Sequence, residues 1–162
     1  MHDPLCLIAA GPEHEPVLAN LLELYIHDFS EFIAKDVGED GRFGYAQLSL
    51  YWSDPRRRPF LARYEDKWAG FALVRKTEED VWDMAEFFIL RRYRRTGLGR
   101  ELAEKVWRRF PGRWQVRVRA DNGAARAFWE TSIARFADET LEAAVVQIDG
   151  MTWNLFSFES HG

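Results

Sequence analysis

The sequence predicts a mixed α/β domain, and three observations carry this prediction. The chain has 162 residues, 47% of them hydrophobic, which is enough for one core and too few to expect two. Apolar residues follow helical spacing in some segments and alternate with period two in others. Gly, Pro, Asn and Asp cluster between these segments, as turns require. We therefore predict a single domain over residues 1–162.

The first segments predict a strand, a helix and a long connection. Residues 4–10 (PLCLIAA) form the short apolar run of a strand. Residues 12–29 predict a helix, because their apolar side chains recur at helical spacing: Val17, Leu18, Leu21, Leu22, Tyr25 and Ile26. Residues 30–54 mix apolar residues with DVGEDGRFG, so we expect a loop with a short second helix around residues 45–52.

The middle of the chain predicts a series of neighbouring strands. Residues 58–64 (RPFLARY) and 69–76 (AGFALVRK) are apolar strands joined by the turn EDKW. Residues 81–90 (VWDMAEFFIL) form a longer strand that closes the hairpin series.

The second half predicts helix, strand, helix and a final hairpin. Leu98, Leu102, Val106 and Phe110 lie four apart and define a helix that ends near Pro-Gly. Residues 114–120 (WQVRVRA) alternate with period two, as a strand does. Residues 121–133 begin with an Asp/Asn cap and continue as a helix. Residues 143–159 read as two strands around an Asp-Gly turn.

The net charge of −4 hides an asymmetry along the chain. The first fifty residues carry many carboxylates and few cations, whereas residues 91–119 are dominated by arginine. This pattern suggests an anion held by one half and a cation received by the other. Solvated helix faces explain many of these charges equally well.

Several other function classes are not favoured. The single Cys6 argues against redox chemistry, and a metal site is not expected because the histidines are scattered: His2, His14, His27 and His161. No apolar run is long enough for a membrane span, and the N-terminus lacks the charge of a secretion signal, so we expect a cytoplasmic protein. Residues 91–95 (RRYRR) could contact nucleic acid, but the chain is acidic overall and phosphate binding already explains the cluster.

Residues 91–103 (RRYRRTGLGRELA) place two glycines and five arginines at the entrance to a predicted helix. The first amides of a helix lack helical partners and attract phosphate oxygens, helped by the helix dipole. Glycine lets a ligand approach those amides, and arginine adds charge-assisted contacts. The spacing matches neither the nucleotide-binding P-loop nor the dinucleotide motif, so neither ATP nor NAD is favoured.

A second motif follows at a defined distance. Arg94-x-x-Gly97-x-Gly99 precedes a helix, a strand and then Asn122-x-x-Ala125-x-x-Phe128-Trp129. This pair of motifs resembles the GNAT superfamily of acyl-CoA-dependent N-acyltransferases over about residues 81–129, and within it a bacterial branch of predicted small-molecule acetyltransferases. The resemblance implies a central mixed, mostly antiparallel sheet flanked by helices, with coenzyme A bound at a splayed strand pair. It also allows a homodimer.

The resemblance implies acetyl-CoA as co-substrate, with the glycine turn around its pyrophosphate and its pantetheine beside the preceding strand. Asn122 is equally well explained as a helix cap. The residues implied in coenzyme binding are Phe88, Ile89, Leu90, Arg94, Arg95, Thr96, Gly97, Leu98, Gly99, Arg100, Asn122, Ala125, Phe128 and Trp129.

An amine acceptor must lose a proton, because an alkyl ammonium has a pKa of roughly 10. We favour Glu86 as the general base, since it interrupts an apolar strand and relatives carry an acidic residue there. Asp83 is the alternative base. The two carboxylates face opposite sides of a regular strand, although a bulge would change that parity.

Trp129 departs from the family pattern, in which tyrosine can protonate the leaving thiolate. An indole donates a hydrogen bond but is no useful acid, so a dedicated general acid is in doubt. Core packing beside Phe128 is the simpler role for its bulk. Water or the ammonium product could supply the proton instead, since ordinary thiols have a pKa near about 8.5.

By resemblance, the first helix, the following loop and the final hairpin bind the acceptor, and residues 28–32 are the expected contacts. Carboxylates alternate there with aromatic rings, a combination that suits an organic cation: Asp28, Phe29, Glu31 and Phe32. The expected activity is transfer of an acetyl group to a primary amine of a small, cationic molecule by direct attack on the thioester. The alternative is a catalytically silent module that binds or senses acyl-CoA.

Overall fold

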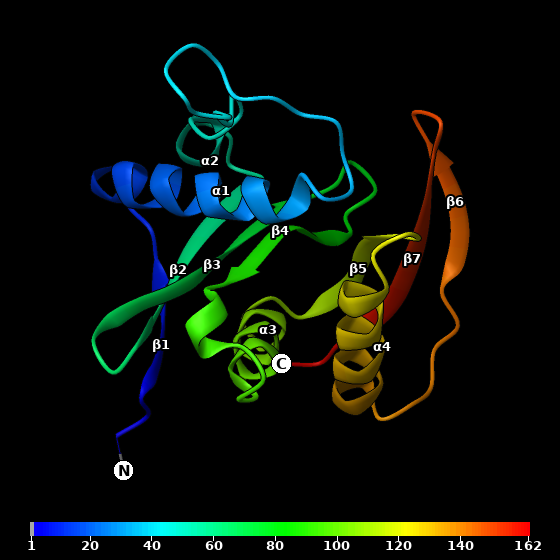
Figure 1. Ribbon diagram of the computed structural model, residues 1–162. Coiled ribbons are helices and arrows are strands. Elements are labelled where there is room, and N and C mark those ends of the chain that lie inside the picture. Colours follow the sequence, from blue (N-terminus) through cyan, green and yellow to red (C-terminus); the bar gives the residue numbers. More distant parts are fainter. Residues whose placement is uncertain (1) are drawn as a thin grey trace.

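The computed structural model describes residues 2–162, and its strands form one seven-stranded sheet (Figure 1). The strands and helices follow the order expected from the sequence. They are β1 (Leu5–Ala9), α1 (Glu15–Phe29), α2 (Leu50–Ser53), β2 (Arg57–Tyr64), β3 (Lys67–Lys76), β4 (Trp82–Ile89), α3 (Leu98–Arg109), β5 (Gly112–Arg119), α4 (Gly123–Ala137), β6 (Ala144–Ile148) and β7 (Met151–Ser160). Short 3-10 turns at Pro12–His14 and Arg91–Tyr93 precede α1 and follow β4.

The strands lie in the order β1-β2-β3-β4-β5-β7-β6. Every neighbouring pair is antiparallel except β4 and β5, which are parallel and joined through α3. The mixed, mostly antiparallel sheet flanked by helices is therefore confirmed.

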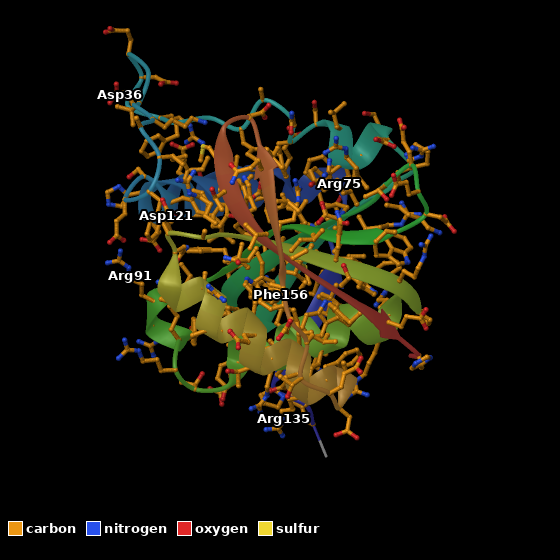
Figure 2. All side chains as sticks on the ribbon, turned by 90° about the vertical axis from the view of Figure 1, so that its right-hand side faces the viewer. Asp36, Arg75, Arg91, Asp121, Arg135 and Phe156 are labelled. Atoms are coloured by element: carbon orange, nitrogen blue, oxygen red, sulfur yellow. The ribbon has the colours of Figure 1, made fainter. Side chains whose placement is uncertain are left out.

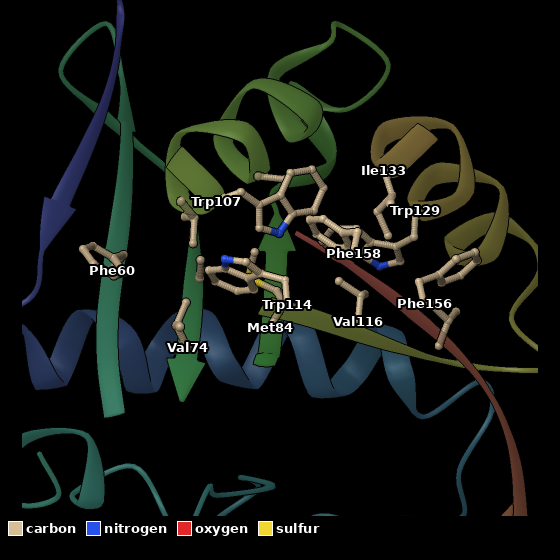
Figure 3. Packing of buried hydrophobic residues seen from close by; sticks show 14 residues of the cluster. Phe60, Val74, Met84, Trp107, Trp114, Val116, Trp129, Ile133, Phe156 and Phe158 are labelled. Atoms are coloured by element: carbon tan, nitrogen blue, oxygen red, sulfur yellow. The ribbon is translucent and has the colours of Figure 1, made fainter. Parts of the chain in front are cut away.

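Helices cover both faces of the sheet (Figure 1). On one face α1 buries Leu18 and Leu22 against Leu61 and Phe71 of the central strands. On the other face α3 and α4 bury a cluster around Trp107 (Figure 3). The period-two alternation of each central strand serves both clusters, since successive side chains point to opposite faces.

Two predicted elements differ in detail. The short helix covers only Leu50–Ser53, because residues 46–49 form turns rather than a continuous helix. The hairpin turn is shorter than EDKW: Glu65 and Asp66 adopt positive φ, while Trp68 already pairs with Arg63 across the strands. The Arg63 guanidinium lies 4.0 Å from the Trp68 ring centroid, a contact that favours the extended pairing.

The parallel strands β4 and β5 pair over a very short stretch. Only Trp82 with Trp114 and Asp83 with Gln115 are in register. On its other side β4 stays paired with β3 as far as Ile89, apart from one irregularity opposite Leu73 and Val74. The edge of β4 that faces β5 therefore loses its partner strand after Asp83, and Figure 1 shows the two strands diverging.

No helix within residues 2–162 combines the length and the apolar character needed to cross a membrane.

Gly70 controls how closely β3 approaches β4 beside this divergence. A Cβ atom at Gly70 would lie 2.0 Å from the carbonyl oxygen of Phe88, so the two strands would have to separate. We expect Gly70→Ala to lower the free energy of unfolding by about 1–3 kcal/mol, the usual cost of overpacking. Urea denaturation measures this change. Gly123→Ala is the matched control, because nothing lies within 4 Å of its Cβ position; an equal loss in both variants would contradict this account.

Candidate active site

A cleft of about 1020 Å³ opens where β4 and β5 diverge. Residues 84–89 of β4 line one wall and residues 116–119 of β5 line the other. The end of α1, the loop after it, the turn before α3 and the start of α4 complete the lining. The sheet thus brings together segments that are far apart in the sequence.

The glycine turn presents unpaired backbone donors to this cleft. Arg95 and Gly97 have φ of 61° and 85°, so the chain turns through the left-handed region before α3 begins. Among residues 2–162, the amide N–H groups of residues 95–100 have no hydrogen-bond acceptor. An oxygen-rich anion could accept several hydrogen bonds here, as at other helix N-termini.

The two glycines of the turn serve different purposes. Gly97 supplies the positive φ, and its Cβ position is nearly open. A Cβ at Gly99 would instead lie 3.2 Å from the Phe128 ring and 3.6 Å from Ile89. Gly99 therefore allows α3 to pack closely on α4 and β4, in addition to leaving the amides accessible.

The arginines beside the turn are anchored to α1. Arg94 donates to the Ile89 carbonyl at 2.8 Å and to Asp28 at 2.7 Å, while Arg91 donates to the other Asp28 oxygen at 2.6 Å. Partial burial favours the neutral form of Asp28, but the two arginines outweigh it and hold the carboxyl pKa below its usual value. Both Asp28 oxygens are thus engaged by guanidinium groups, and Asp28 does not offer an acceptor a free charge.

The second motif combines capping and packing. The Asn122 side chain accepts a hydrogen bond from the Ala125 amide at 3.1 Å and caps α4, while also lining the cleft. Trp129 is 8% exposed, with its ring centroid 4.9 Å from Phe87 and 4.8 Å from Phe128. Its bulk fills the core below the cleft.

Three residues implied in coenzyme binding do not line the cleft. Leu90 donates its amide to Ala69 at 2.9 Å and packs with the cluster under α1. The Thr96 hydroxyl donates to the Tyr93 carbonyl at 2.7 Å, and the Leu98 side chain is buried below α3. The other implied residues border the cleft: Phe88, Ile89, Arg94, Arg95, Gly97, Gly99, Arg100, Asn122, Ala125, Phe128 and Trp129.

A bulge in β4 decides which way the two candidate bases point. Leu73 pairs with Glu86 whereas Val74 pairs with Met84, so Ala85 is an extra residue in β4. Since one added residue reverses the alternation, Asp83 and Glu86 face the same side of the sheet despite being three positions apart. Their surroundings on that side are very different.

Asp83 is fully buried and bound to two arginines. Its Oδ2 accepts from Arg75 Nε at 2.8 Å and from Arg117 Nη2 at 3.1 Å. Its Oδ1 has no hydrogen-bond partner among residues 2–162, and the side chain does not line the cleft. Asp83 therefore ties β3, β4 and β5 together at the last residue before the divergence.

Glu86 lines the cleft itself. The Tyr45 hydroxyl donates to its Oε1 at 3.4 Å. Burial raises the pKa of the Glu86 carboxyl above its usual value, and this outweighs the opposing influence of the Tyr25 and Tyr45 hydroxyls and of Arg117. A carboxylate with a raised pKa beside an open strand edge can accept a proton from a bound molecule.

Sequence reasoning missed several residues of the cleft. The spacing of Tyr25 is that of the apolar stripe of α1, yet its hydroxyl reaches Glu86 and its ring contacts Phe71 and Phe88. The alternation of β5 predicts that Arg117 and Arg119 share one face of the strand, but it does not predict that this face borders the cleft. Tyr45 and Trp153 were not singled out: the resemblance pointed to the loop and the final hairpin as regions, but no local pattern marks these two residues within them.

The acceptor residues implied by the resemblance gather at one end of the cleft. Phe29 and Phe32 lie with ring centroids 6.3 Å apart, and Glu31 lines the same end. In Figure 2, Asp36 projects outward on the loop, while Arg91 and Asp121 lie at the same edge of the molecule. Within residues 2–162, no three His, Cys, Asp or Glu side chains are grouped so as to hold a metal ion.

Comparison with known proteins identifies the family. A family model described as Acetyltransferase (GNAT) family matches residues 18–132. The chain belongs to the GNAT acetyltransferase family. It is therefore an acyltransferase, and the resemblance noted in its motifs is confirmed. No curated protein sequence matches the chain significantly.

Solved structures share the GNAT fold over nearly the whole chain. An acetyltransferase from Thermus thermophilus is 20% identical, with a TM-score of 0.71 over 98% of this chain and 99% of that one. The ribosomal-protein-S18-alanine N-acetyltransferase of Escherichia coli is 17% identical, with a TM-score of 0.65 over 96% and 94%. The spermidine N-acetyltransferase of Vibrio cholerae, solved with CoA and spermine, is 13% identical, with a TM-score of 0.66 over 97% and 96%.

Asp83 is expected to stabilise the fold of this GNAT enzyme strongly. Asp83→Asn removes the charge that two arginines share at a fully buried position, so we expect a loss of about 2–4 kcal/mol in the free energy of unfolding. The control is Asp80→Asn, which breaks an exposed pair with Lys76 and should cost about 0.5 kcal/mol or less. Chemical denaturation measures both. Equal stability of the two variants would show that the Asp83 ion pairs are not structural.

Proposed function

We propose that this GNAT enzyme transfers an acetyl group from acetyl-CoA to a primary amine of a small molecule, with Glu86 as the general base. The observation that carries the proposal is the position of Glu86, which lies in the cleft on the open edge of β4 with a raised carboxyl pKa. Asp83, the alternative base, is enclosed by two arginines and has no access to the cleft.

The chain offers acetyl-CoA a fitting surface. The free amides of residues 95–100 would accept the pyrophosphate, with Arg95 and Arg100 adding charge. The edge of β4 that lacks a partner strand after Asp83 would pair with the amide groups of the pantetheine arm, as an added strand would, up to the Ile89 carbonyl that Arg94 engages. Asn122 and Phe128 would border that arm from the side of α4.

Glu86 has a defined task in the transfer. Acetyl-CoA supplies the activated thioester carbonyl carbon. The amine becomes a nucleophile only after its ammonium, with a pKa of roughly 10, gives up a proton, which Glu86 would take directly or through water. The new N–C bond forms as the C–S bond breaks. Because Trp129 is no useful acid, we expect water or the ammonium product to protonate the thiolate.

The acceptor is expected to lie among Glu31, Phe29 and Phe32. These side chains line the cleft where α1 ends, and Glu86 lines the same cleft. Aromatic faces and a free carboxylate suit an arriving ammonium group. Asp28 does not take part in this way, because Arg91 and Arg94 engage both of its oxygens.

Glu86→Gln tests the role of the base. The amide keeps the shape but cannot take a proton, so kcat should fall by about 10²- to 10⁴-fold while the dissociation constant of acetyl-CoA changes little. Thiol release with a panel of primary amines measures the rate, and calorimetric titration measures binding. Glu78→Gln is the control, since Glu78 is exposed in the turn between β3 and β4. A Glu86→Gln variant with the wild-type rate would contradict the assignment of Glu86 as the general base.

A further inference from the structure

Two side chains that line the cleft carry buried hydrogen-bond donors for which residues 2–162 supply no acceptor. They come from β5 and β7, on the wall opposite Glu86, and the activity proposed above gives them no role. The two side chains are Arg117 and Trp153.

Arg117 is incompletely paired. A guanidinium has five N–H donors, and Arg117 makes one hydrogen bond within residues 2–162, to Asp83. Arg75 uses the same Asp83 oxygen, so two positive charges share one carboxylate. The Arg117 Nε is buried without an acceptor, while the side chain as a whole is 28% exposed and lines the cleft. Its remaining charge is available to a ligand.

Trp153 adds a second donor on the same wall. Its indole Nε1 is buried with no acceptor among residues 2–162, and the side chain lines the cleft. Trp153 pairs with Arg119, one alternation beyond Arg117 on β5, and the Arg119 guanidinium lies 5.9 Å from the indole ring centroid. Arg119 itself is satisfied by Asp121, at 3.0 and 2.8 Å.

The charge balance changes when Glu86 takes a proton. With Glu86 ionised, the four groups Arg75, Asp83, Glu86 and Arg117 are neutral as a set. With Glu86 protonated, the set carries one excess positive charge in a partly buried place. The proton comes from the ammonium of the acceptor, so this excess charge enters the site with the acceptor, and an anionic group on the acceptor would compensate it.

We propose that the acceptor is a small primary amine that also carries a carboxylate, such as an amino acid, and that Arg117 binds this carboxylate. Trp153 would donate a further hydrogen bond to it. Glu86 and Arg117 line the same cleft, so one small molecule would carry both the amine and the carboxylate. This inference rests on the proposed N-acetyl transfer and names its substrate class.

Matched acceptors test the substrate class with the wild-type enzyme. Each set holds an amino acid, its carboxamide and its decarboxylated amine, and thiol release from acetyl-CoA gives kcat/KM. We expect the amino acid to be preferred at least tenfold, as a charge-assisted hydrogen bond allows. If the carboxamides or the decarboxylated amines react with the same kcat/KM as the amino acids, the proposed carboxylate site is wrong, but the proposed N-acetyl transfer is supported. If no amine of any kind reacts, both proposals fall.

Variants of the two donors locate the carboxylate site. Trp153→Phe keeps the ring and removes Nε1, and Arg117→Lys keeps the charge beside Asp83 while losing the guanidinium geometry. Both should raise the KM of the amino acid several-fold more than the KM of the decarboxylated amine, while the dissociation constant of acetyl-CoA changes little. An equal loss for every acceptor would point to a disturbed fold and would overturn the assignment of these donors.

A different observation concerns the loop that carries Tyr45. Glu23 of α1 accepts backbone hydrogen bonds from Phe43 at 2.7 Å and Gly44 at 2.9 Å, and its carboxylate lies 3.9 Å from Arg42. Gly44 has a φ of 73°, so the chain turns sharply immediately before Tyr45. The Tyr45 hydroxyl then reaches Glu86.

We also infer that Glu23 is a positioning residue, which fixes the loop so that Tyr45 meets the general base. Glu23 has no contact with Glu86 and would act only through the loop. The charged and titratable groups that face Glu86 come from α1, the loop, α2, β4 and β5: Tyr25, Tyr45, Tyr51, Asp83 and Arg117.

A double-mutant cycle tests this arrangement, in which Glu23 holds the loop of residues 42–45 and is called the clamp below. The Tyr45 hydroxyl lowers the pKa of Glu86, so losing it should raise that pKa and move the acidic limb of the kcat/KM profile to higher pH. We expect Glu23→Ala and Tyr45→Phe to shift the limb in this same direction. The double variant should match Tyr45→Phe within about twofold in kcat.

A Glu23→Ala variant with an unshifted acidic limb would contradict the clamp, as would losses that multiply in the double variant. A purely structural role for Glu23 would lower the amount of folded enzyme without moving the limb. The two proposals can be distinguished, because the loss of rate in Glu86→Gln tests only the assignment of Glu86 as the base, whereas the Glu23 and Tyr45 variants test the clamp.

Discussion

The short pairing between β4 and β5 is the constraint on which the rest of the site depends. Backbone N–H and C=O groups are normally paired in a sheet, yet β4 leaves its β5-facing edge without a partner strand after Asp83. Water can satisfy these groups, and so can an extended ligand. The extra residue Ala85 lies at the start of this open edge and turns Glu86 into the cleft. The irregularity in β4 thus lies where the open edge begins and sets the side of the sheet that Glu86 faces.

Ion pairs divide the charged residues into structural and available groups. Asp28 joins α1 to the two arginines at the end of β4 and thereby holds the glycine turn against the body of the protein. Asp83 joins three strands where they begin to diverge. Both carboxylates are candidate functional groups in the sequence, but in the structure both form ion pairs with arginines. Glu86 has tyrosine hydroxyls and an apolar surrounding instead, and this leaves it free to exchange a proton.

The sequence predicted the order of the elements well, because each has a local signal. The four-residue spacing of α3, the Asn122 cap of α4 and the Asp-Gly turn between β6 and β7 are all local patterns. The orientation of Glu86 was not predictable in this way, since a bulge depends on how two strands pair. Tyr45 and Trp153 lie far from the motifs in the sequence, and only the folded chain brings them to the cleft. The partners of Asp28 were hidden for the same reason, because Arg91 and Arg94 are distant along the chain.

The central claim is that free amides at the glycine turn, beside the open edge of β4, bind the diphosphate of coenzyme A. Amide hydrogen exchange, followed residue by residue with and without saturating acetyl-CoA, tests it most directly. In the free protein the amides of residues 95–100 should exchange quickly, since the protein provides no acceptor for them. With acetyl-CoA present they should become protected, together with amides on the open edge of β4. Unchanged exchange at saturating ligand, or amides already protected in the free protein, would contradict the account.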